Sequence, residues 1–233
     1  MVEITMSWPS RNALGEETMR ALVSKIRDAD GAPLLLRGST DAFCAGLNLR
    51  EVASLDGRTV EPFLRLLEAL MSTLYLYPGP TAACIEGHAI AGGCLLALCC
   101  DVRVATTRSD VRLGLNEVAL GLRFPPRVFR IAKRRVPVTS HEEVLLGASL
   151  FEPTEALGVG LIDTIDEHPY EVAKARLARL ATLPAEAYAA TKLDLRERDL
   201  DVPAEEEGHF YRDAISTWTA PALRSRIAKL LQR

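Results

Sequence analysis

The sequence predicts an α/β protein with a helical C-terminal region, and three observations predict it. Over residues 1–165, short apolar runs typical of strands alternate with amphipathic helical stretches. From residue 166 onward only helical periods occur. The length of 233 residues suits one large domain with a tail, because domains usually hold about 100 to 150 residues. We therefore divide the chain into an α/β core, 1–165, and a helical region, 166–233.

Hydrophobic periodicity predicts the elements of the first half. Met19, Leu22 and Ile26 fall on one helical face. The run 34–36 is short and wholly apolar, as in a strand that is buried on both faces. The expected elements are a strand at 2–6, a helix at 16–29, a strand at 34–36, a helix from about 63 that stops before Pro78, and a strand at 81–85.

The second half is expected to surround a buried helix. Residues 94–100 are apolar on every side, which is typical of a central helix. Residues 139–143 read as a capping box that opens a helix ending at Gly147. The other expected elements are strands at 102–105, 111–113 and 161–165, a helix at 128–135, and C-terminal helices that carry apolar stripes.

Composition and charge exclude several classes of protein. Hydrophobic residues make up 48% and charged residues 25%, which excludes a disordered chain. The net charge of −3 gives no sign of a nucleic-acid or anionic-membrane partner. The longest apolar stretch, 89–100, is shorter than the about 20 residues that span a bilayer. The first residues show no signal-peptide pattern. We expect a cytoplasmic protein that binds neither nucleic acid nor a membrane.

The five cysteines predict reduced thiols. Their number is odd, four lie in apolar runs, and no C-x-x-C lies near a histidine. This usage is typical of a reducing compartment and predicts neither a disulfide framework nor a metal site.

Two glycine-containing turns could carry chemistry. Residues 87–95 read as a strand, a glycine turn and the start of the buried helix. Free N–H groups at a helix N-terminus form a site for an oxyanion. Residues 43–49 form a second turn of this kind, so two N–H donors could meet at one oxygen. Neither G-x-G-x-x-G nor a phosphate-binding lysine motif is present, which argues against a nucleotide site. Taken singly, each turn is more often a packing device.

Five segments in order resemble the crotonase (enoyl-CoA hydratase/isomerase) superfamily over nearly the whole chain. They are Arg11–Leu14, Phe43–Asn48, Gly87–Cys94, Leu113–Gly121 and Ala156–Asp163. The resemblance implies a core of repeated ββα units. It also implies a C-terminal region that forms a homotrimer or a dimer of trimers.

The resemblance implies an acyl-CoA substrate, with coenzyme A as part of the substrate and no separate cofactor. The N–H groups of Leu47 and Gly92 would hold the thioester oxygen. Asn48 departs from the family's aspartate at that position. The positions implied in substrate binding are Ala13, Ala45, Leu47, Asn48, Leu49, Gly92, Leu95 and Phe124.

The departures from the family pattern favour one subclass. Hydratases carry a glutamate at the position of Leu95 and a second at that of Glu117, whereas only Glu117 is present here. A single base with an oxyanion site suits the transfer of a double bond from position 3 to position 2. Leu95 would then be an apolar wall that raises the pKa of Glu117. Residues 91–95 and 114–117 resemble the mitochondrial-type 3,2-enoyl-CoA isomerase branch.

Two rival functions stay open. One is a hydratase or lyase of the same fold in which His88 or Glu86 serves the water. The other is a catalytically degenerate acyl-CoA-binding subunit, suggested by the missing carboxylate at Leu95. Arg50 could meet a phosphate of coenzyme A or be solvated. The basic run 123–135 suits a solvated helix face or a subunit contact better than a phosphate site.

Overall fold

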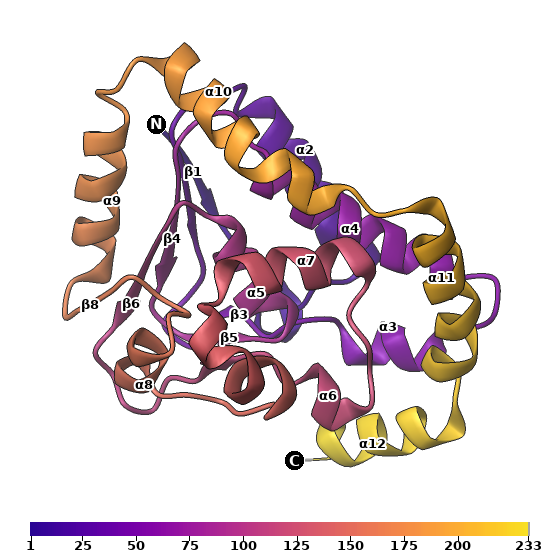
Figure 1. Cartoon of the computed structure of the whole chain (residues 1–233). Helices are drawn as coiled ribbons and strands as arrows, with labels where there is room; N and C mark the ends of the chain where they lie inside the picture. Colours follow the sequence, from indigo (N-terminus) through magenta and orange to yellow (C-terminus); the bar gives the residue numbers. More distant parts are fainter. Residues whose placement is uncertain (233) are drawn as a thin grey trace.

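Two parallel sheets organise the computed structural model, which describes residues 1–232 (Figure 1). The larger sheet has the order β1 (Val2–Thr5), β2 (Leu34–Arg37), β4 (Thr81–Ile85), β6 (Val102–Thr106), β8 (Thr164–Asp166). The smaller sheet has the order β3 (Ala42–Cys44), β5 (His88–Ile90), β7 (Leu113–Gly114). From β2 to β8 successive strands alternate between the two sheets, so the chain winds as repeated ββα units and the predicted α/β fold class is confirmed.

Helices fill the space beside the two sheets. The first set is α2 (Glu16–Asp28), α3 (Leu49–Ser54), α4 (Val60–Tyr75), α5 (Gly92–Cys99), α6 (Glu117–Leu120), α7 (Pro126–Arg135) and α8 (Pro153–Gly158). All eight residues of α5 are buried, as expected for a helix that is apolar on every side. The short α1 (Pro9–Asn12) is a left-handed turn, because Ser10, Arg11 and Asn12 have φ of 56°, 60° and 58°.

Three expected elements differ from the structure. Residues 139–147 form no capped α-helix: a 3₁₀ turn (Val138–Ser140) precedes a π turn (Glu142–Leu146), and Thr139 caps neither. The capping box of this region lies instead at Glu152 and Glu155, where α8 begins. The strands expected at 111–113 and 161–165 pair only at β7 and β8, because the residues before each pairing run through turns.

The C-terminal helices pack closely on the core. They are α9 (Pro169–Leu180), α10 (Ala185–Arg196), a 3₁₀ turn η3 (Glu197–Leu200), α11 (Ala204–Trp218) and α12 (Pro221–Leu231). Ala173 and Leu177 of α9 pack on Leu35, Cys84 and Val104 of the larger sheet. In Figure 1, α11 and α12 close the side of the molecule where α3, α6 and α7 lie. The trimerisation role of this region stays a prediction.

A buried ion cluster holds α10 to the core. Asp101, which lies just before β6, accepts a hydrogen bond of 2.8 Å from Lys192 Nζ and pairs with Arg196 at 2.7 Å. Tyr188 donates to the same carboxylate at 2.8 Å. These charged partners hold the pKa of Asp101 below its usual value against the effect of burial. The cluster therefore fixes α10 on the core, because a buried carboxylate needs charged and hydrogen-bonding partners and α10 supplies them.

Candidate active site

The two glycine turns of the sequence meet in space. The Leu14 N–H donates to Gly46 O at 2.7 Å and the Asn48 N–H to Leu14 O at 3.0 Å, and these two bonds align the turn at 43–49. A Cβ on Gly93 would lie 2.0 Å from the Cys44 carbonyl oxygen. Only glycine therefore lets the start of α5 approach the end of β3 this closely.

The backbone N–H groups of Leu47 and Gly92 lie where the two turns meet. An ideal Cβ on Gly92 would lie 3.7 Å from Leu47 N. Within residues 1–232, neither the Leu47 nor the Gly92 N–H donates to another protein group. Ala91, directly before α5, has the rare φ of 49° with ψ of −120°, and backbone strain of this kind is typical of functional sites. Two adjacent free donors at a helix N-terminus can stabilise one oxyanion.

A cavity of about 330 Å³ adjoins these donors and is largely apolar. Leu95, one turn into α5, is one of its walls and is itself buried. The residues that line it come from seven stretches of the chain: Arg11, Ala45, Leu47, Leu49, Val52, Leu67, Ile90, Ala91, Gly92, Leu95, Asn116, Glu117, Leu120, Leu122, Arg123, Phe124, Pro125, Val128, Trp218 and Leu230. Such a lining suits an acyl chain, with few polar groups to orient it.

Among the residues that the structure describes, Glu117 supplies the one carboxylate in that lining. The residue as a whole is half-buried, but its Oε2 is buried and has no hydrogen-bond partner within residues 1–232. Burial raises the pKa of Glu117 from 4.5 to about 8, and a hydrogen bond from its own backbone N–H opposes the shift. That Leu95 in particular contributes to this shift stays a prediction. A group with this pKa can both take and return a proton near neutral pH.

The structure brings together most of the predicted site residues. Ala45, Leu47, Leu49, Gly92, Leu95, Glu117 and Phe124 all line the cavity. Ala13 and Asn48 lie outside the lining. Ala13 is buried, and Asn48 caps α3 by accepting from the Arg50 N–H at 3.2 Å. That both touch the substrate stays a prediction.

Sequence patterns do not indicate several of the residues that line the cavity. Trp218 of α11 and Leu230 of α12 reach the cavity from the C-terminal region. Their helices carry apolar stripes in the sequence, but no pattern states that these stripes fold back over the same chain's core. Leu67 of α4 and Val128 of α7 also line the cavity, which the apolar periodicity of their helices does not indicate.

His88 and Glu86, the two groups that could serve the water in a hydratase, lie outside the cavity lining. His88 Nδ1 accepts a hydrogen bond of 3.0 Å from the Arg112 N–H, which marks a structural histidine. Glu86 is paired with Arg37 at 2.7 Å. Both side chains are therefore engaged elsewhere.

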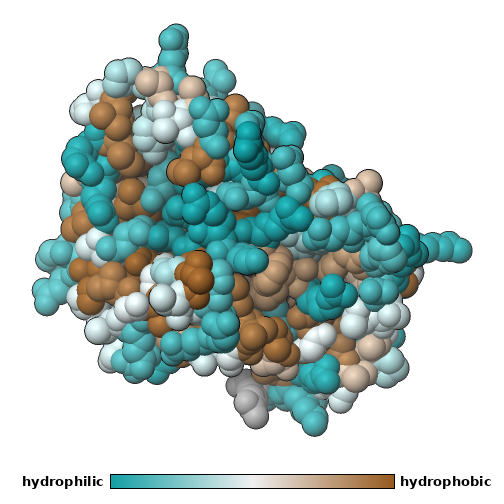
Figure 2. Space-filling model, viewed as in Figure 1, coloured by the Kyte–Doolittle hydropathy of each residue, from teal (hydrophilic) through white to brown (hydrophobic). Residues whose placement is uncertain are grey.

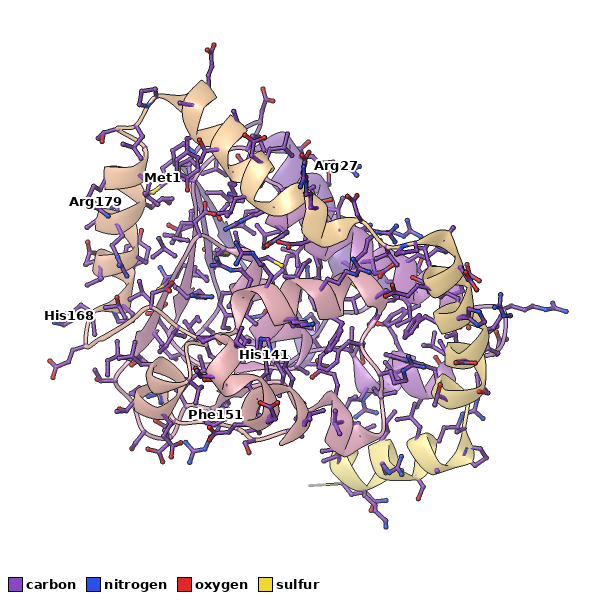
Figure 3. All side chains as sticks on the ribbon, viewed as in Figure 1. Met1, Arg27, His141, Phe151, His168 and Arg179 are labelled. Atoms are coloured by element: carbon purple, nitrogen blue, oxygen red, sulfur yellow. The ribbon has the colours of Figure 1, made fainter. Side chains whose placement is uncertain are left out.

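Intramolecular contacts occupy much of the basic run on α7. Arg127 pairs with Glu68 of α4 and Glu207 of α11. Arg130 pairs with Glu206 at 2.9 Å. Lys133 and Arg134 are exposed, and hydrophilic residues cover much of the face on which α7 lies (Figure 2). At the carboxyl end of α7, His141 Nε2 bonds to the carbonyls of Lys133 and Val136 (Figure 3). The run thus mainly ties α7 to its neighbours.

No metal site accompanies the cavity in the described part of the chain. Residues 1–232 contain no group of three or more His, Cys, Asp or Glu side chains placed to hold an ion. Within the same residues no helix has both the length and the apolar character needed to cross a membrane.

The chain belongs to the enoyl-CoA hydratase/isomerase family, whose model matches residues 1–210. Enoyl-CoA delta isomerase 1, mitochondrial, from Rattus norvegicus is 32% identical over 164 residues, which cover 68% of this chain and 56% of that protein. Enoyl-CoA hydratase domain-containing protein 2, mitochondrial, from Homo sapiens is 34% identical over 169 residues, 70% of this chain and 57% of that protein. The match thus spans little more than half the length of these two relatives.

The fold agrees with this membership. The crystal structure of human mitochondrial delta3-delta2-enoyl-CoA isomerase superposes with a TM-score of 0.90 over 99% of this chain and 92% of that chain, at 23% identity. The resemblance to the crotonase superfamily that the motifs indicated is confirmed.

Proposed function

We propose that this protein is an enoyl-CoA isomerase that moves a double bond from position 3 to position 2 of the acyl chain. One observation carries the proposal: among the residues described, Glu117 is the only carboxylate lining an otherwise apolar cavity next to two free N–H donors. The family membership supports an acyl-CoA substrate, and coenzyme A enters as part of it.

The arrangement suits a proton transfer with one base. The thioester oxygen would accept hydrogen bonds from the N–H groups of Leu47 and Gly92, which stabilise the negative charge of a dienolate. Glu117 takes the proton from the α carbon, and the electron pair of that C–H bond enters the dienolate. The same carboxyl then returns the proton to the γ carbon, so the conjugated 2-enoyl thioester forms and Glu117 is regenerated.

Hydration is the alternative that needs more groups than the cavity offers. Water addition uses one group to activate the water and another to deliver a proton to carbon. Leu95 can do neither, and His88 and Glu86 lie outside the lining. Relatives named for isomerase and for hydratase both match this chain, so the assay must compare the two reactions.

Ultraviolet absorbance of the conjugated thioester separates the candidates. The protein is mixed with a trans-3-enoyl-CoA and, in parallel, with a trans-2-enoyl-CoA. Growth of absorbance from the first, abolished by Glu117→Gln, is the expected result. Loss of absorbance from the second at a comparable rate would establish the hydratase. Tight binding of both thioesters without turnover would establish the degenerate binding subunit.

We further propose the homotrimer, or dimer of trimers, that the family resemblance implies. Helix α10 supports it by exposing Leu193 and Leu195, which are 45% and 56% exposed. Light scattering coupled to gel filtration tests the proposal, and a monomer at micromolar concentration would refute it.

A further inference from the structure

Two buried acceptors without donors lie side by side in the sequence at the cavity. Asn116 Oδ1 and Glu117 Oε2 are both buried and have no hydrogen-bond partner within residues 1–232. Both residues line the cavity. Unsatisfied buried polar atoms are rare in native proteins and call for an explanation, such as a catalytic role.

Helix capping does not explain Asn116. It occupies the N-cap position of α6, where asparagine usually accepts a hydrogen bond from the first helical turn. Its side chain makes no such bond. Asn48, at the same position of α3, does cap its helix, with its oxygen 3.2 Å from Arg50 N. The Asn116 amide is therefore left free beside the cavity.

Protonation of Glu117 would turn one of the two orphaned atoms into a donor. Because the backbone N–H of Glu117 already donates to its own carboxyl, Oε2 is the oxygen left to carry a proton. A protonated Oε2 is a donor that needs an acceptor, and Asn116 Oδ1 is an acceptor that needs a donor. We infer that Asn116 is a positioning residue for Glu117, whose Oδ1 accepts a hydrogen bond from the protonated Oε2.

This inference adds a step to the isomerase reaction and in that respect rests on the proposed function. After Glu117 has taken the α proton, the hydrogen bond to Asn116 holds the O–H until the same proton is delivered to the γ carbon. The bond breaks when the proton leaves, so atoms and charge balance. The product should therefore keep much of the hydrogen taken from the substrate when the reaction runs in D2O.

Other titratable and charged groups of residues 1–232 lie around the cavity and on the helices beside it. Arg11 and Arg123 line the cavity, the Cys94 thiol lies on α5, and Arg226 of α12 bonds to the Leu120 carbonyl of α6. None of them causes the shift in the pKa of Glu117, which burial dominates. A change in that pKa on substitution of Asn116 therefore reports on the amide itself or on water that enters in its place.

The experiment measures the pKa of Glu117 without using activity. The free energy of unfolding is followed against pH for the wild type and Glu117→Gln, then for Asn116→Ala with and without Glu117→Gln. Loss of one hydrogen bond to the neutral carboxyl should lower the pKa by about 0.4 to 1 unit. Asn116→Asp should raise it, since it adds a like charge beside Glu117.

Leu120→Ala is the matched control, because Leu120 also lines the cavity but offers no acceptor. An equal fall of the pKa in Leu120→Ala would assign the effect to entering water and overturn the inference. An unchanged pKa in both Asn116 variants would also overturn it. The second readout is the fraction of substrate-derived hydrogen retained in D2O, which should fall in Asn116→Ala. If no enoyl-CoA is isomerised, the proposed function fails, whereas the pKa comparison still decides the role of Asn116.

Discussion

Glu117→Gln should make the protein more stable at neutral pH while it abolishes isomerisation. In the folded protein the pKa of Glu117 is raised to about 8 from the 4.5 of an unburied carboxyl. Between these two values the folded state holds a proton on Glu117 that the unfolded state has lost. The free energy of unfolding therefore falls as pH rises through this window. Glutamine, which does not ionise, removes that dependence.

The size of this stability difference follows from the shift in the pKa of Glu117. At 1.36 kcal/mol per pKa unit, the whole window is worth roughly 5 kcal/mol, and the part accumulated by pH 7 is roughly 3 kcal/mol. Both are upper bounds, because water that enters the cavity solvates the ionised carboxylate. We expect Glu117→Gln and the wild type to have about the same free energy of unfolding near pH 4. The variant should then be the more stable of the two, by a difference that grows up to pH 8.

Urea unfolding at several pH values and one fixed protein concentration measures this difference, since the proposed assembly of subunits would make stability depend on concentration. Glu167→Gln is the control, because Glu167 is exposed in the segment between β8 and α9. Its difference from the wild type should stay small and nearly constant. A constant difference for Glu117→Gln, or a variant that is less stable than the wild type at pH 8, would refute the burial argument.

Three further outcomes are expected. First, kcat/KM for isomerisation should rise with pH to a plateau above about 8, since the base must be ionised in the free enzyme; a flat profile from pH 6 to 9 would contradict this. Second, Gly46→Ala should lower kcat about 100- to 1,000-fold, because Gly46 has φ of 89° and a Cβ there would lie 2.8 Å from the Ile90 carbonyl oxygen, which would displace the N–H groups proposed to bind the oxyanion; steady-state kinetics that match the wild type would exclude that site. Third, Asp101→Asn should cost about 3 to 5 kcal/mol in urea unfolding, because it leaves Lys192 and Arg196 buried without a counter-charge; a loss below 1 kcal/mol would show that the cluster is solvated.

Local patterns predicted the elements where the local and the tertiary preferences agree. The strand expected at 81–85 is β4 without a change of bounds, because its residues are buried on both faces and all but Thr81 are apolar. The helix expected at 94–100 is the buried α5. The helix expected at 139–147 is wrong: its side-chain pattern allows a capped α-helix, whereas the chain forms a 3₁₀ turn and a π turn between α7 and α8. A capping motif carries no information about that turn.

The candidate site divides in the same way. The sequence by itself determined the family, the two glycine turns and Glu117, because close backbone approach and proton transfer each demand particular residue types at particular positions. Only the tertiary structure decided that Trp218 of α11 lines the same cavity and that His88 and Glu86 are engaged outside it. It also decided that Asn116 Oδ1 has no hydrogen-bond partner within residues 1–232. The physical reason is that residue type states what a side chain can do, whereas burial and the partners that surround it decide which of those things it does.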